Sequence, residues 1–217
     1  MSAADLPAAP APDPIREPWE SLHRQRLGSS LGIWIFLGSE AMLFGGLIMA
    51  VVANRALHPQ AFAAAGHETD VVLGTLNTAI LLTSSLTMAI ASEAAQAELR
   101  RTALRGFALT LLLGLAFLAV KGFEYHKDIT ERLVPGSGSG KPGPASQIFF
   151  GFYWGMTALH ALHMTAGLGV VGWLGWQAWT RRRALRSPAY EVVALYWHLV
   201  DIVWVFLYPL FYLGGRS

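Results

Sequence analysis

Histidine and carboxylate side chains lie inside stretches that are otherwise apolar, and these are the residues that could do chemistry. His160 and His163 occur in "MTALHALHM", and His198 and Asp201 occur in "ALYWHLVDIVWVFLYPLFYL". Glu40 lies in "FLGSEAMLFGG". Imidazole and carboxyl groups bind metal ions, exchange protons and form strong hydrogen bonds. The pattern therefore indicates a function or a structural contact that needs buried polar groups.

Three interpretations of the histidines and the aspartate follow from their spacing. Residues three apart share a helix face, so Asp201 can accept a hydrogen bond from His198 and both can tie neighbouring helices together. His160, His163, His198 and Asp201 are also a plausible ligand set for a metal ion. A third interpretation is a role in proton transfer or in binding lipid headgroups. Spacing alone leaves all three open.

The composition is that of a membrane protein. Of the 217 residues 53% are hydrophobic and only 14% are charged, with a mean hydropathy of +0.41, whereas soluble domains carry about 25% charged residues. The chain has no cysteine, which excludes disulfides and thiolate metal sites. The net charge of +2 gives no reason to expect a nucleic-acid partner. We therefore predict an all-α membrane protein.

A helix needs about 20 residues to cross a bilayer. Four of the five apolar segments exceed this length, and the one at residues 106–123 is slightly shorter. We expect a mobile cytoplasmic tail over residues 1–27 and a five-helix transmembrane domain over residues 28–217. Between the segments, "NRALHPQAFAAAGHETD" reads as a polar loop and "VPGSGSGKPGPASQ" as a flexible external loop. The expected helices cover residues 30–53, 71–95, 106–123, 148–180 and 190–213.

The distribution of Lys and Arg predicts the orientation. Ten of these residues lie in the tail and in the second and fourth connections, and six, Lys121 among them, lie on the other side. The positive-inside rule then places the N-terminus in the cytoplasm and the C-terminus in the periplasm. A cluster of cations beside a span also suits anionic phospholipid headgroups. The headgroup candidates are Arg181, Arg182, Arg183 and Arg186.

Glu40 lies about 15 Å along its helix from the cytoplasmic end, at about 1.5 Å per residue. A charge at that depth costs at least about 2.5–3.5 kcal/mol, so we predict a protonated Glu40 that forms hydrogen bonds between helices. Glu124, in "KGFEYHKD", is close to a membrane boundary, and a solvated helix cap is expected there. Small residues permit close contact between helices. The relevant glycines are Gly38, Gly45, Gly46, Gly151 and Gly155.

"LYWHLVDIVWVFLY" resembles the final helix of subunit III of the haem–copper oxidases, the cytochrome c oxidase type. The matching residues are Trp197, His198, Val200, Asp201 and Trp204. "TALHALHMTAGL" resembles the family's His-x-x-His helix, and "GIWIFLGSEAMLFGGL" its helix with a buried glutamate, here Glu40. "LNTAILLTSSLTMAIA" and "FEYHKDI" resemble two further motifs. The resemblance covers residues 31–213 in the family's order.

The resemblance implies an accessory subunit without a redox centre, in the short five-helix bacterial form, in the inner membrane. Such a subunit of an aa3-type cytochrome c oxidase packs on catalytic subunit I, beside subunit II and a small subunit IV, while haem and copper stay in those partners. It binds phospholipids and supports proton uptake and stability. The histidines would then hold helices together rather than bind metal. Alternatives are a quinol oxidase subunit III, the related accessory protein of nitric oxide reductase and, more remotely, an independent proton or solute transporter.

Overall fold

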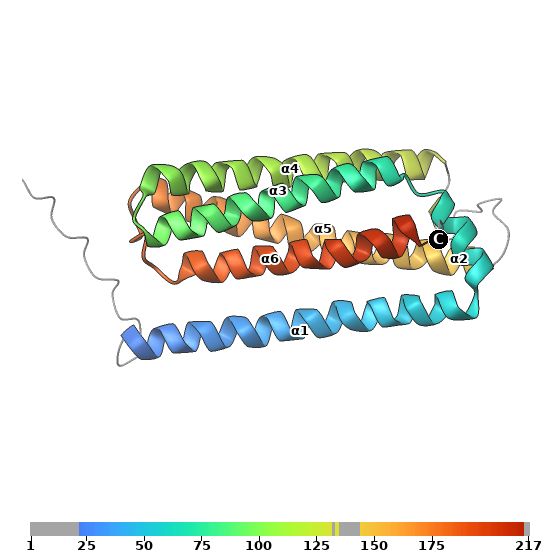
Figure 1. Ribbon diagram of the computed structural model, residues 1–217, viewed down its shortest axis with the longest axis horizontal. Helices are drawn as coiled ribbons and strands as arrows, with labels where there is room; N and C mark the ends of the chain where they lie inside the picture. Colours follow the sequence, from blue (N-terminus) through green and yellow to red (C-terminus); the bar gives the residue numbers. More distant parts are fainter. Residues whose placement is uncertain (1–21, 132, 135–143, 215–217) are drawn as a thin grey trace, which may run out of the picture.

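The computed structural model describes residues 22–131, 133–134 and 144–214, and in these ranges the chain is helical with no strand. Residues 1–21 of the predicted tail and most of the predicted external loop lie outside the described residues. The helices labelled in Figure 1 are α1 (Leu22–Leu57), α2 (Pro59–His67), α3 (Val71–Gln96), α4 (Arg100–Thr130), α5 (Pro144–Trp179) and α6 (Ala189–Tyr208). The π-helix η1 (Pro209–Leu213) follows α6.

Helices α3, α4, α5 and α6 form an antiparallel bundle, and α1 lies along its side against α6 and α5 (Figure 1). The long helices alternate in direction, so the bundle has two distinct ends. The start of α1 and the α3–α4 and α5–α6 connections lie at one end, called here the basic end. Helix α2, the last turns of α4 and η1 lie at the other, called here the opposite end.

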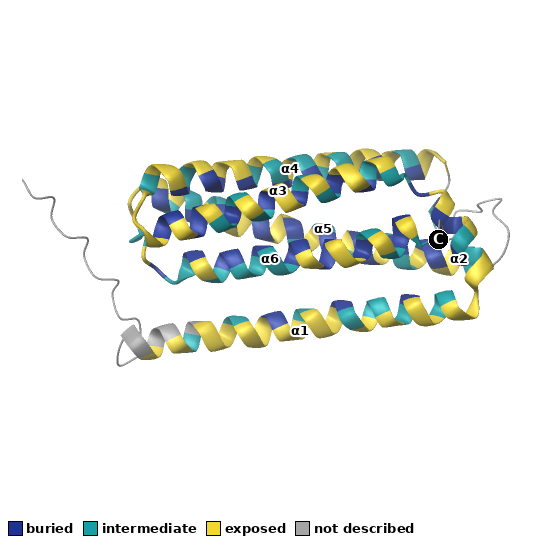
Figure 2. Ribbon diagram, in the orientation of Figure 1, coloured by how far each residue is buried: buried dark blue, intermediate teal, exposed yellow. Residues whose placement is uncertain are grey.

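Four helical segments are long and apolar enough to cross a membrane: Ser30–Leu57, Val71–Gln96, Arg100–Thr130 and Ala189–Leu213. The 36-residue α5 is not among them, because its two histidines and several glycines and tryptophans lower its hydropathy. Large apolar side chains such as Met42, Leu112 and Phe206 are exposed on the outside, while the buried residues face inward (Figure 2). The chain is therefore an all-helical, multi-pass membrane protein.

Several expected boundaries differ from the structure. The first helix, expected at residues 30–53 after a tail of residues 1–27, begins at Leu22 and ends at Leu57. The third apolar segment, expected at residues 106–123, belongs to a helix of 31 residues, because charged residues at both ends continue it. The first connection was expected to be a polar loop, yet most of it forms α2. Pro59 stands at the start of α2, where its missing N–H is not needed. Phe62 and Ala65 are buried, and this burial against α5 and η1 holds the short helix in place.

Side chains at the basic end close the helix termini. Glu98 and Arg181 follow the ends of α3 and α5 with φ of 60° and 56°, the left-handed conformation that terminates many helices. Arg100 at the start of α4 donates hydrogen bonds to the carbonyls of Ala178 and Trp179 at the end of α5. A cation at a helix C-terminus also interacts favourably with the helix dipole. These contacts join the two connections of the basic end.

Close approach of α3 and α4 depends on Gly106. A Cβ atom at this position would lie 2.7 Å from Ala91 Cβ and 3.0 Å from Ala91 Cα. The five glycines singled out from the sequence make no such close contact with the described residues, because a Cβ atom at each of them would meet nothing within 4 Å. These positions are Gly38, Gly45, Gly46, Gly151 and Gly155.

We predict that Gly106→Ala destabilises the bundle, because the added methyl group meets backbone that has no room to move. Overpacking of this kind costs about 1–3 kcal/mol. Gly122→Ala in the same helix is the matched control, since a Cβ there meets nothing within 4 Å. Unfolding in mixed micelles measures both variants, and equal stabilities would contradict the prediction.

Candidate functional site

The polar residues predicted from the sequence are distributed over three separate contacts. Among the described residues, no three His, Asp or Glu side chains are grouped so that they could hold a metal ion. His160, His163, His198 and Asp201 do not form such a group. Each of these residues faces a different set of neighbours.

Glu40 of α1 contacts His163 of α5. Its Oε2 atom lies 3.0 Å from His163 Nε2, and both side chains are largely buried. His163 Nδ1 lies 2.8 Å from the carbonyl oxygen of Leu159, and that oxygen can only accept, so Nδ1 is the donor. Glu40 Oε2 makes no hydrogen bond of normal geometry with a described residue, so the pair is a close contact between a carboxyl oxygen and a ring nitrogen.

His160 is enclosed by aromatic side chains. Its ring packs against Trp204 with centroids 5.2 Å apart and edge-on against Phe117 at 5.6 Å. Neither ring nitrogen has a hydrogen-bond partner among the described residues. His160 thus fills the space between α4 and α6, and it does not pair with His163.

His198 and Asp201 do not form the hydrogen bond that their spacing allows. Nδ1 of His198 instead contacts the hydroxyl of Ser85 in α3 at 2.8 Å. Neither carboxyl oxygen of the buried Asp201 makes a hydrogen bond of normal geometry with a described residue, although Ser85 is its neighbour. Two tryptophans of α6 also donate to α3, Trp197 to Ser84 and Trp204 to Thr78. Polar contacts therefore line the α3–α6 interface.

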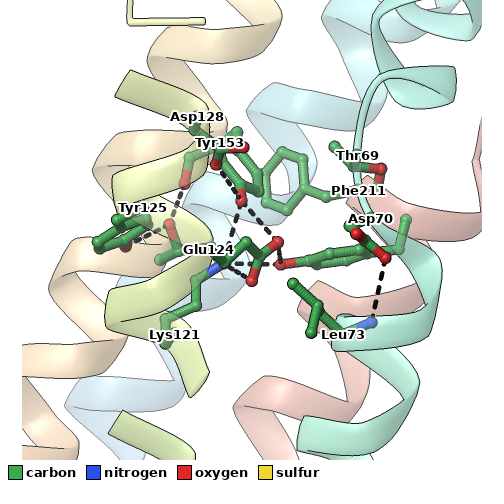
Figure 3. Close-up of polar contacts among 12 residues, drawn as sticks. Thr69, Asp70, Leu73, Lys121, Glu124, Tyr125, Asp128, Tyr153 and Phe211 are labelled. Atoms are coloured by element: carbon green, nitrogen blue, oxygen red, sulfur yellow. Dashed lines mark hydrogen bonds and ion pairs between the residues drawn. The ribbon is translucent and has the colours of Figure 1, made fainter. Parts of the chain in front are cut away.

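The most extensive polar cluster lies at the opposite end of the bundle and was not foreseen (Figure 3). It consists of Lys121, Glu124 and Asp128 of α4, Tyr153 of α5 and Tyr212 of η1. Lys121 Nζ donates to Glu124 Oε2 at 3.0 Å, to Tyr153 Oη at 3.1 Å and to Tyr212 Oη at 2.7 Å. All three donor positions of the ammonium are used.

The rest of this cluster, called here the Lys121 cluster, is equally compact. Tyr212 Oη donates to Glu124 Oε1 at 2.6 Å, and Tyr153 Oη lies 2.9 Å from the same oxygen and 3.0 Å from Asp128 Oδ2. The ammonium also lies within 5.5 Å of four aromatic ring centroids. Such cation–π contacts stabilise a desolvated cation.

Two expectations from the sequence are wrong at this cluster. Glu124 is only 1% exposed, so it is not a solvated cap. Lys121 is 2% exposed, so it is a buried ion-pair partner and not one of the charges outside the membrane. One signal could have found the cluster: Lys121, Glu124 and Asp128 recur three and four residues apart, on one helix face.

Asp70, just before α3, forms a second contact at the opposite end. Its Oδ1 atom accepts hydrogen bonds from the N–H groups of Val72 and Leu73, and its Oδ2 atom lies 2.9 Å from Lys127 Nζ. The hydrogen bond from Lys127, together with those amides, holds the pKa of Asp70 below its usual value. Asp70 thus caps α3 and links its start to the end of α4.

The four arginines of the basic end differ in their contacts. Arg183 donates to Gln177 and to Ser187, and Arg186 forms an exposed ion pair with Glu98 at 3.2 Å. Arg182 lies over the ring of Trp176, 4.6 Å from its centroid. Arg181 and Arg182 are exposed. The structure therefore leaves cationic groups at the surface of the basic end.

We predict that Lys121→Met strongly destabilises the bundle, because it leaves the buried Glu124 carboxylate without its counter-ion. Removing one partner of a buried pair costs about 3–5 kcal/mol. Lys127→Met is the matched control in the same helix, since the Lys127–Asp70 pair is partly exposed and exposed pairs contribute little to stability. Unfolding in mixed micelles gives both values. The prediction fails if the two variants lose the same stability.

Comparison with known proteins agrees with this architecture. The family model for cytochrome c oxidase subunit III matches residues 19–216. The chain is 29% identical over 190 residues to cytochrome c oxidase subunit 3 of Thermostichus vulcanus, covering 86% of this chain and 87% of that protein. It is 29% identical over 192 residues to cytochrome c oxidase subunit 3 of Alkalihalophilus pseudofirmus, covering 85% and 86%. It is also 28% identical over 188 residues to a probable quinol oxidase subunit 3 of Staphylococcus haemolyticus, covering 86% and 89%. These matches are to subunit III of terminal oxidases, an accessory subunit that works within a complex of several subunits. The chain therefore belongs to the cytochrome c oxidase subunit III family.

Proposed function

We propose that the chain crosses the bacterial inner membrane five times, with its N-terminus in the cytoplasm and its C-terminus in the periplasm. The fifth span is α5, whose 36 residues run antiparallel to the apolar helices beside it (Figure 1). Because Lys121 is buried, the Lys and Arg residues divide ten to five in favour of the basic end. This sharper asymmetry supports a cytoplasmic basic end.

Within the oxidase, we propose that the subunit packs on catalytic subunit I of an aa3-type cytochrome c oxidase, together with subunit II and a small subunit IV. It carries no redox centre, and haem and copper reside in those partners. Its task is to hold phospholipid and to support proton uptake and the stability of the complex. The observation that carries this proposal is the family match over residues 19–216. The contacts of Glu40, His163 and His198 suit a packing subunit, because each joins two helices of the bundle.

A quinol oxidase is the second candidate, favoured by the probable quinol oxidase subunit 3 of Staphylococcus haemolyticus at nearly the same identity. The accessory protein of nitric oxide reductase is a further alternative. An independent proton or solute transporter has less support. Glu40 and His198 each form a local pair, with His163 of α5 and with Ser85 of α3, and such pairs suit helix packing better than transport.

Purification of the chain in mild detergent tests the proposal. We expect subunits I, II and IV of a haem–copper oxidase to co-purify, with haem and copper absent from this chain after it is separated from them. Oxygen consumption with reduced cytochrome c but not with quinol would assign the cytochrome c branch, and the reverse would assign the quinol branch. Purification without any haem–copper subunit would contradict the proposal.

The topology makes a direct prediction. A reporter inserted in "GSGSGKPG", between α4 and α5, should be accessible from the periplasm, because this connection follows the end of the bundle with fewer cations. A reporter in the α5–α6 connection, "RRRALRSP", should be protected in the same cells. The opposite pair of results would invert the topology.

The arginines of the basic end are proposed to hold anionic lipid. A cavity of about 490 Å³ lies at the basic end, and Arg186 is the one of the four arginines that lines it, together with Leu27, Ile33 and Leu195 among others. Each cation near an anionic surface contributes about 1 kcal/mol. Changing Arg181, Arg182, Arg183 and Arg186 to Gln should release co-purifying anionic lipid, as measured by mass spectrometry. The control is Arg105→Gln, an exposed arginine of α4 at the same end. If the fourfold variant retains the same anionic lipid, these arginines have only a topological role.

For Glu40 we predict a structural role. Glu40→Gln should be nearly silent, because the amide keeps the size of the carboxyl group and its capacity for hydrogen bonds. Glu40→Ala should loosen α1, since it leaves polar partners unsatisfied at a cost of about 1–3 kcal/mol. The measurements are turnover and proton release by the assembled oxidase, with subunit content as the control. A fully assembled Gln variant that pumps poorly or loses activity over many turnovers would assign Glu40 to proton support instead.

A further inference from the structure

The hydrogen bonds of the Lys121 cluster require one more proton than its lysine and tyrosines supply. A phenol has a single proton to donate. Tyr153 Oη nevertheless lies within hydrogen-bonding distance of two carboxyl oxygens, Glu124 Oε1 at 2.9 Å and Asp128 Oδ2 at 3.0 Å (Figure 3). If both carboxyl groups were ionised, one of these contacts would bring two oxygen atoms together with no proton between them.

The neighbouring donors do not relieve this shortage. The three ammonium protons of Lys121 are directed to Glu124 Oε2, Tyr153 Oη and Tyr212 Oη. The hydroxyl proton of Tyr212 is directed to Glu124 Oε1 at 2.6 Å. Every proton that these residues provide is thus committed elsewhere, and the contact between Tyr153 and Asp128 still lacks one.

A proton on Asp128 completes the network. Asp128 then donates to Tyr153 Oη, and Tyr153 donates to Glu124. Tyr153 Oη accepts two hydrogen bonds, from Lys121 and Asp128, and donates one, which is the full capacity of a phenol. The charges also balance, because Lys121 is +1, Glu124 is −1 and Asp128 is neutral. Without this proton the buried cluster would carry an uncompensated negative charge, which is costly away from water.

We infer that Asp128, Tyr153 and Glu124 form a binding site for one exchangeable proton at the opposite end of the bundle. The proton has two positions. When the Asp128 O–H bond breaks, a bond forms to Tyr153 Oη, whose own O–H bond breaks as a bond to Glu124 Oε1 forms. Asp128, at 7% exposed against 1% for Glu124, is the carboxyl group that exchanges the proton with water.

The surroundings make this a store for a proton and not a path across the membrane. The two neighbouring tyrosines form hydrogen bonds with threonines and not with the cluster: Tyr125 donates to Thr157, and Tyr208 is hydrogen-bonded to Thr75. His160, the next titratable group toward the middle of the bundle, offers no hydrogen-bonded link, because neither ring nitrogen has a partner among the described residues. Among the described residues, the other charged groups nearby include the Asp70–Lys127 pair and the exposed Glu131. The inference concerns this chain's own residues and does not depend on the electron donor of the oxidase.

Infrared spectroscopy of the full chain, purified with its partner subunits, tests the inference. The carbonyl stretch of a protonated carboxylic acid is separate from the bands of a carboxylate. Spectra are recorded from about pH 5 to about pH 9, across the range in which perturbed carboxyl groups titrate. We expect a band of a protonated carboxyl group that is lost in Asp128→Asn. Glu131→Gln, a carboxylate at the exposed end of the same helix, is the control and should retain it.

A second variant keeps the test decisive. In Glu124→Gln the ammonium of Lys121 loses its counter-ion, so Asp128 should ionise, and the same band should disappear although Asp128 is still present. Asp128→Asn keeps the shape of the neutral acid, so the Asp128→Asn variant should assemble at the wild-type yield. A band that survives in Asp128→Asn, or one that survives in Glu124→Gln, would overturn the shared-proton site.

Discussion

A polar side chain within a membrane bundle has no water to bond to, so it needs a partner on a neighbouring helix. This constraint accounts for most of the specific contacts in the structure. Lys121 of α4 donates to tyrosines of α5 and η1, His198 of α6 contacts Ser85 of α3, and Glu40 of α1 contacts His163 of α5. Apolar packing alone would tolerate other rotations of these helices, because lipid is as apolar as leucine. The polar contacts select one.

The constraint acts unevenly along the bundle. Helices α3 and α4 approach closely at Gly106 and form the most extensive interface, and the Lys121 cluster joins α4, α5 and η1 at the opposite end. Helix α1 depends on fewer contacts, since only 17% of its apolar span is buried within the chain against 44% for the last span. Its polar attachments include the Glu40–His163 contact and the hydrogen bond from Arg55 to the carbonyl of Gly214. A helix attached in this way exposes most of its apolar surface to lipid or to other subunits.

An accessory subunit of an oxidase needs this kind of construction. It has to keep a defined shape within a complex of several subunits, and buried polar contacts define shape more sharply than hydrocarbon packing does. The Lys121 cluster adds a second property, because a network that needs one extra proton responds to pH in the same residues that hold three elements together. Structure and titration are coupled there through Tyr153, whose hydroxyl faces both carboxyl groups.

The sequence by itself determined the class of the protein, its family and the approximate positions of its helices, because these follow from local composition and from motifs such as "LYWHLVDIVW". It also singled out Glu40, His160, His163, His198 and Asp201 as buried polar residues. Only the tertiary structure decided their partners: His198 pairs with Ser85 instead of Asp201, and Glu124 is buried beside Lys121 instead of capping a helix in water. The physical reason is that Ser85, Tyr153 and Tyr212, which complete these contacts, come from other elements far away in the chain. A one-dimensional pattern contains the helix face but not the neighbour that it meets.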